Sequence, residues 1–156
     1  MEDSSLKKIM VPTDNSEDSA EAFRIALDFA EKDGSVILVL HVVHVAHLTD
    51  GSWQKSDHTD EINLVEEGWK KTEEFVGKHK GDRTAVAVEV EVREGEPVEE
   101  ILRAVEEEEI DLIVIGTHGK KGLTHTLMGS VAEKIVRHAS CPVLTVTHRA
   151  IASSAA

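Results

Sequence analysis

Five short apolar runs rich in β-branched residues alternate with four segments of helical periodicity, and this alternation constrains the fold most strongly. The apolar runs are residues 7–12, 36–44, 85–93, 112–115 and 143–146. Alternating strand and helix units of this length build a parallel sheet with right-handed crossovers and helices on both faces. We therefore predict an α/β fold with an open, doubly wound, five-stranded parallel sheet.

Helix boundary signals separate these runs. The first helix follows the capping candidates Asn15 and Ser16 and stops at Gly34, and the third opens at Pro97. Residues 47–60 form a polar segment without periodicity, which we predict to be a mobile loop before the second helix. Residues 85–93 alternate apolar and polar side chains, as a half-exposed edge strand does.

Length and charge limit the classes of function. The 156 residues fit a single domain, spanning residues 1–156 with an ordered core of about 5–148. Thirty acidic against seventeen basic residues give a net charge of −13, which repels nucleic acid and anionic membranes. With one cysteine, Cys141, no signal peptide and no run of 18 apolar residues, we expect a cytoplasmic protein without membrane or nucleic-acid partners.

A glycine-rich loop follows the fourth apolar run. Gly116, Gly119 and Gly129 form a GxxGx9G pattern, and Ser130 then opens an amphipathic helix. Helix N-termini attract anions through unpaired N–H groups, and glycines let a phosphate approach the backbone. The alternative is that these glycines only allow tight turns and close packing. The loop is not a Walker A motif, because no GK(S/T) ends it, and the first turn lacks the glycines of a dinucleotide-binding fingerprint.

Four other sequence blocks accompany this loop: PTD at 12–14, LHV at 40–42, GEPVEEIL at 95–102 and CPVLTV at 141–146. With them the chain resembles, over nearly its whole length, the ATP-binding subgroup of the universal stress proteins, whose motif is GxxGx9G(S/T). The resemblance implies the strand order 3-2-1-4-5. The end of the first strand, with Asp14, then meets the end of the fourth, with Gly116, at the switch point where open α/β sheets bind ligands.

The resemblance also implies an adenine nucleotide site that holds ATP with Mg²⁺ or Mn²⁺. Amides around Gly119, Gly129 and Ser130 would hold the phosphates, Gly116 would line the ribose side, and Asp14 would lie by the adenine and ribose. Backbone near Val42 would read the adenine edge. The expected pocket walls are Pro12, Thr13, Ile115 and Val131, and His118 is a further candidate in the loop.

Other residues have plainer interpretations. Asp14 can also cap the first helix, and Lys120 and Lys121 either cover a triphosphate or are only solvated. His41, His44 and His47 resemble metal ligands in spacing, but on a strand the outer two lie about 20 Å apart, so we expect no metal site. Cys141 is expected to be a small buried residue, and residues 106–109 a solvated helix face.

Three functions remain open at this stage. The first is an ATP-binding protein of stress response or signalling, without catalytic residues and dimeric through the last strand, residues 143–147, as the resemblance implies. The second is a slow ATPase or another nucleotide-dependent enzyme of the adenine nucleotide alpha hydrolase-like fold. The third is a nucleotide-free dimeric interaction module.

Overall fold

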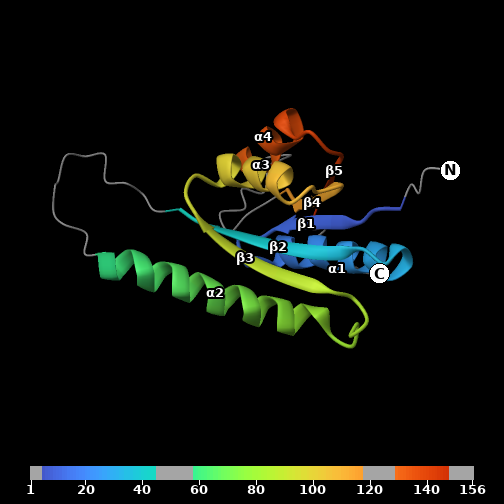
Figure 1. Ribbon diagram of the computed structural model, residues 1–156, viewed down its shortest axis with the longest axis horizontal. Helices are drawn as coiled ribbons and strands as arrows, with labels where there is room; N and C mark the ends of the chain where they lie inside the picture. Colours follow the sequence, from blue (N-terminus) through green and yellow to red (C-terminus); the bar gives the residue numbers. More distant parts are fainter. Residues whose placement is uncertain (1–4, 45–57, 118–128, 148–156) are drawn as a thin grey trace, which may run out of the picture.

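The computed structural model describes residues 5–44, 58–117 and 129–147, which form a five-stranded parallel sheet in the order β3-β2-β1-β4-β5 (Figure 1). This confirms the predicted fold and strand order. The strands are β1 (Lys8–Pro12), β2 (Val36–Val43), β3 (Val88–Glu94), β4 (Leu112–Gly116) and β5 (Val143–Val146). The helices are α1 (Glu17–Asp33), α2 (His58–Lys80), α3 (Pro97–Glu107) and α4 (Ser130–His138).

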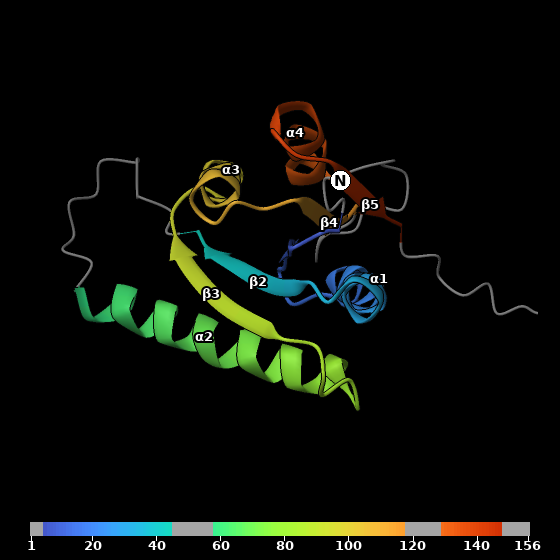
Figure 2. The ribbon, with the colours of Figure 1, turned by 45° about the vertical axis from the view of Figure 1, so that its right-hand side comes forward.

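Two helices cover each face of the sheet, with α1 and α2 on one side and α3 and α4 on the other (Figure 2). Successive residues of β2 alternate between these layers, as strand geometry requires. Ile37 and Val39 belong to the core under α1 and α2, whereas Leu38 and Leu40 belong to the core under α3 and α4. Both faces of the central strands are therefore buried, which explains their nearly continuous apolar sequence.

The helix ends follow the boundary signals with one exception. Ser16 is the N-cap of α1, and Gly34 ends it with a left-handed φ of 74°. Helix α2 begins at His58, inside the segment expected to be a loop, so that prediction is wrong for its last residues. The remainder of that segment lies outside the described residues.

The residues that α2 buries are not simply its largest apolar ones. Thr72 and Phe75 are buried, and so is Gly68, whereas Trp69 is 37% exposed. None of the helices in the described part of the chain is long and apolar enough to cross a membrane.

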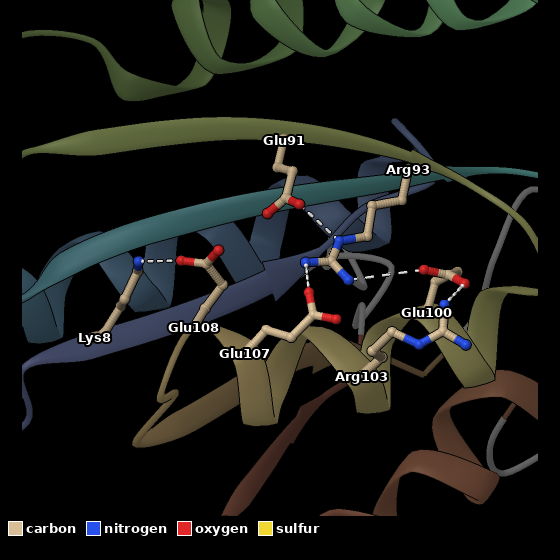
Figure 3. Close-up of polar contacts among 7 residues, drawn as sticks. All are labelled: Lys8, Glu91, Arg93, Glu100, Arg103, Glu107 and Glu108. Atoms are coloured by element: carbon tan, nitrogen blue, oxygen red, sulfur yellow. Dashed lines mark hydrogen bonds and ion pairs between the residues drawn. The ribbon is translucent and has the colours of Figure 1, made fainter.

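The face of β3 that is turned toward α3 carries charged side chains, and one of them, Arg93, pairs with α3 (Figure 3). Arg93 lies 2.7 Å from carboxylate oxygens of both Glu91 and Glu107 and 3.7 Å from Glu100. Lys8 of β1 lies 2.8 Å from Glu108, and this ammonium hydrogen bond lowers the pKa of the Glu108 carboxyl. Residues 106, 107 and 109 are exposed, as expected of a solvated helix face, but the carboxylates of Glu107 and Glu108 also link α3 and its end to the sheet.

Candidate functional site

The carboxyl ends of β1 and β4 lie side by side, because these strands are parallel neighbours at the centre of the sheet. The chain leaves β1 toward β2 and β3 on one side, and later returns to β4 and β5 on the other. This is the topological switch point, where open α/β sheets bind ligands. Three predicted site segments meet here: the β1–α1 turn (residues 13–16), the end of β4, and the start of α4.

Hydrogen bonds within the β1–α1 turn fix Asp14. Its Oδ1 accepts a hydrogen bond from the Ser16 amide at 3.0 Å and from the Ser19 hydroxyl at 2.9 Å. The cap of α1 is Ser16, whose hydroxyl oxygen accepts a long hydrogen bond from the Ser19 amide at 3.4 Å. Asp14 therefore organises the turn beside the cap rather than replacing it.

Asn15 gives this turn its sharp shape. Its φ of 64° is in the left-handed region, which asparagine tolerates better than most residues. Its backbone amide donates a hydrogen bond to the Thr13 hydroxyl at 2.8 Å. Its Oδ1 atom is buried and has no hydrogen-bond partner among the described residues. A buried acceptor of this kind costs about 1–3 kcal/mol, so the turn carries some strain and desolvation cost.

Gly116 and Gly129 each allow a close approach between backbones. A Cβ on Gly116 would lie 3.0 Å from the carbonyl carbon and oxygen of Asp18 in the first turn of α1. A Cβ on Gly129 would lie 2.9 Å from the Thr117 carbonyl oxygen, which also accepts a hydrogen bond from the Gly129 amide. Both glycines are therefore required by packing, and they bring the end of β4 against α1 and against the start of α4.

The N-terminus of α4 has no capping side chain among the described residues. Gly129 is the N-cap, and no side chain of the described residues caps this nine-residue helix. Ser130, the first residue of the helix, is exposed. The first N–H groups of a helix have no intrahelical acceptor and carry about half a positive charge, so this end can bind a phosphate or a carboxylate.

The expected wall residues differ in their burial. Pro12, Thr13 and Ile115 are buried, whereas Val42 and Val131 are half-buried at the edge of the core under α3 and α4. His118 and Gly119 lie outside the described residues, as do Lys120, Lys121 and His125. Nine of the eleven predicted site residues are thus among the described residues, on β1, β2 and β4, in the turn after β1 and at the start of α4, and their role in a site stays a prediction.

His41 is a site neighbour that the sequence reasoning missed. Its Nδ1 atom lies 2.8 Å from the Thr13 carbonyl oxygen, so β2 contacts the β1–α1 turn through a side chain. The available signal was its place next to Val42, at the end of the strand that pairs with β1. The spacing of the histidines suggests only a metal ligand at His41, and the described residues contain no group of three or more His, Cys, Asp or Glu side chains that could hold a metal ion.

Cys141 lies away from this site and is only half-buried, which corrects the expectation of a buried residue. Burial, together with the negative charge of Asp111, raises the pKa of the Cys141 thiol. The neutral thiol is a poor nucleophile. Cys141 therefore adds no reactive thiolate to the site. The groups at the switch point are suited to an anion beside polar side chains.

Comparison with known proteins identifies relatives of the whole chain. The sequence model of the Universal stress protein family matches residues 5–147. The universal stress protein MJ0531 of Methanocaldococcus jannaschii is 37% identical over 144 residues, covering 90% of this chain and 81% of the relative. The solved structure of MJ0577, a universal stress protein of the same organism, superposes with a TM-score of 0.79 at 30% identity, covering 92% of this chain and 97% of that one.

Two further solved structures are described with ligands. One is a universal stress protein in complex with cAMP, at a TM-score of 0.69 and 21% identity, covering 92% of this chain and 98% of that one. The other is the universal stress protein of Archaeoglobus fulgidus in complex with dAMP, at a TM-score of 0.60 and 20% identity, covering 90% and 97%. At these identities the two structures establish the shared fold.

Proposed function

The chain belongs to the universal stress protein family, and from this premise we propose that it binds an adenine nucleotide, ATP, where β1 and β4 end. One observation carries the proposal: the Asp14 turn and the N-terminus of α4, which no described side chain caps, both lie by the Gly116 end of β4. A carboxylate suited to ribose or adenine groups and an amide cluster suited to phosphate thus share one edge of the sheet. The cAMP and dAMP complexes of two relatives in fold support an adenine ligand.

Each predicted residue has a role in this proposal. Ser130 and the amides at the start of α4 bind phosphate oxygens, with Gly119 and His118 adding contacts from the glycine loop. Asp14 and the backbone near Val42 bind the ribose and the adenine between the walls Pro12, Thr13, Ile115 and Val131. Gly116 contributes its backbone, because the position of its absent side chain is filled by α1.

The proposed cation is Mg²⁺ or Mn²⁺, which neutralises phosphate charge when it is bound. Magnesium usually keeps several waters and is held mainly through the phosphates of its nucleotide, so it does not require a protein cage. The described residues contain no cluster of three or more His, Cys, Asp or Glu ligands, which does not count against this mode. We propose a binding and signalling role in stress response within the cytoplasm.

The two edges of the sheet support pairing of two copies through β5, residues 143–147. Edge strands that carry charged side chains resist pairing with another chain, whereas uncharged edges invite it. The outer strand β3 carries Glu89, Glu91 and Arg93, but the opposite edge strand β5 has the uncharged sequence VLTV. We propose a homodimer through the β5 edge on this contrast.

A nucleotide-free interaction module is the second candidate, because packing alone accounts for Gly116 and Gly129. The substitution Ser130→Glu separates the two functions. A carboxylate in the first turn favours the helix dipole and so keeps or raises stability, but it repels a phosphate at the same place. We expect the affinity for ATP to fall at least about tenfold, since a charge contact of this kind contributes about 1.5–3 kcal/mol.

The test is calorimetric titration of nucleotide-stripped protein with ATP and Mg²⁺. The matched control is Lys134→Gln, which makes the same change of one negative unit at an exposed position of the same helix. The control should bind as the wild type does. Equal affinities of the Ser130→Glu variant and the wild type would refute the phosphate site, and a wild type that binds no nucleotide would favour the interaction module.

A further inference from the structure

We propose that His41 is a positioning residue of this site: from β2 it holds the Thr13 carbonyl group and thereby the turn that presents Asp14. The expected effect of His41 on ATP affinity rests on the proposed nucleotide function. The hydrogen bond and the shape of the turn can be tested in the ligand-free protein. His41 would not touch the nucleotide. It would act through the peptide unit that joins Thr13 to Asp14.

The first argument is the hydrogen bond itself. Nδ1 of His41 lies 2.8 Å from the Thr13 carbonyl oxygen, and a carbonyl oxygen can only accept. The hydrogen therefore lies on Nδ1. Because His41 lies on β2 and Thr13 directly follows β1, the bond ties the β1–α1 turn to β2. It lies beyond the bond in which the Thr13 amide donates to the Leu40 carbonyl at 2.8 Å.

The second argument is that this peptide unit is held at both ends. Its carbonyl oxygen accepts from His41, and its other end, the Asp14 amide, lies 3.3 Å from the Ser19 hydroxyl oxygen. A peptide unit is planar, so fixing both ends fixes the direction in which the chain enters Asp14. The Asp14 carboxylate then meets Ser16 and Ser19 as described above, and loss of the His41 bond would release one of the two ends.

The third argument is that α2 holds the imidazole ring in place. A Cβ on Gly68 would lie 3.3 Å from Cδ2 of His41 and 3.1 Å from Cγ2 of Val43. The backbone of α2 therefore closes directly over the ring, which leaves little room for the side chain to turn away. A larger residue at position 68 would press on the group that holds the β1–α1 turn.

Two substitutions test the proposal. His41→Asn keeps an N–H donor at the δ position, and His41→Leu has a similar bulk without a donor. We expect the leucine variant to bind ATP with Mg²⁺ about tenfold more weakly, as loss of a hydrogen bond of typical strength predicts, while the asparagine variant stays within about threefold of the wild type. Urea unfolding of both variants measures their stability, so that a loss of ATP affinity can be distinguished from partial unfolding.

The ligand-free protein gives an independent measurement. Nitrogen-15 spectra of the histidine ring should show the hydrogen on Nδ1 of His41, and the amide signals of Asp14 and Ser16 should shift in the leucine variant and return in the asparagine variant. If the leucine variant does not fold, His41→Gln replaces it, because its amide reaches the ε position instead of the δ position.

The outcomes separate the two proposals. A wild type that binds no ATP refutes the nucleotide site, and the ring and amide signals then decide the role of His41 alone. A hydrogen on Nε2 only, unchanged Asp14 signals in the leucine variant, or equal weakening by leucine and asparagine would overturn the positioning role. In a wild type that binds ATP, unchanged affinity of the leucine variant would also overturn it.

Discussion

Two glycines of α2 should respond in opposite ways to the same substitution. Gly77 is exposed, and a Cβ there meets no atom within 4 Å, so Gly77→Ala gains only helix propensity and should stabilise the protein by about 1 kcal/mol. Gly68→Ala gains the same propensity, but its Cβ would lie 3.1 Å from Val43, 3.3 Å from His41 and 3.4 Å from Val92. The magnitude therefore depends on whether these three side chains can move.

The surroundings of Gly68 favour a net loss of stability. Val43 and Val92 are β-branched residues on strands with restricted χ1 angles, and His41 is held by its hydrogen bond to Thr13. Overpacking of a site that cannot yield costs about 1–3 kcal/mol, which exceeds or cancels the propensity gain. We therefore expect Gly68→Ala to be less stable than Gly77→Ala by about 1–3 kcal/mol.

Urea unfolding followed by circular dichroism measures this difference directly. We expect the free energy of unfolding of the wild type to lie between those of the two variants or near one of them. The m-values should agree, since neither substitution changes the surface exposed on unfolding. Equal stabilisation by the two alanines would show that α2 does not approach the sheet as closely as described. It would also remove the argument that α2 fixes the ring of His41.

Three further predictions concern the turn, the end of β4 and the charged face. Asn15→Ala should be less stable than Asn15→Gly by about 1–2 kcal/mol in urea unfolding, because only glycine accepts the left-handed φ without strain; equal stabilities would contradict this. Gly116→Ala should lose about 1–3 kcal/mol in the same assay, because its Cβ would meet backbone atoms of Asp18 that cannot rotate away; a neutral result would refute this contact. The lowered pKa of Glu108, caused by the Lys8 hydrogen bond, stabilises the fold above the ordinary value of 4.5 and is lost as pH falls through the lower folded-state value. Lys8→Met should therefore reduce the loss of stability that occurs as the pH is lowered through this range. An unchanged dependence of stability on pH would argue against the pair.

The sequence predicted the layer arrangement well because its signals are local and repeated. Alternating apolar runs, the cap at Ser16 and the stop at Gly34 each depend on neighbouring residues, and the resemblance supplied the strand order. The start of α2 was missed because its first residues are polar, so the apolar periodicity begins only at Ile62. A helix can begin with such residues, since its first turn is often solvated and capped by polar groups.

The candidate site was harder to predict where it depends on contacts between distant segments. The role of His41 arises from a bond between β2 and the β1–α1 turn, and that of Gly68 from the contact of α2 with β2 and β3, so neither leaves a periodic signal. Gly116 and Gly129 were found by their motif, but packing explains them as fully as a phosphate does. His118 and Gly119 stay predictions, because they lie outside the described residues.

The unequal edges of the sheet also set a limit on assembly. A two-fold contact through the uncharged strand β5 would use the same edge from both copies, and the outward strand of each would then be β3. That strand carries three glutamates, Glu89, Glu91 and Glu94, against the single Arg93, so further growth by strand addition would bring two edges of net negative charge together. Association by this route would end in a closed pair and not in an open-ended filament.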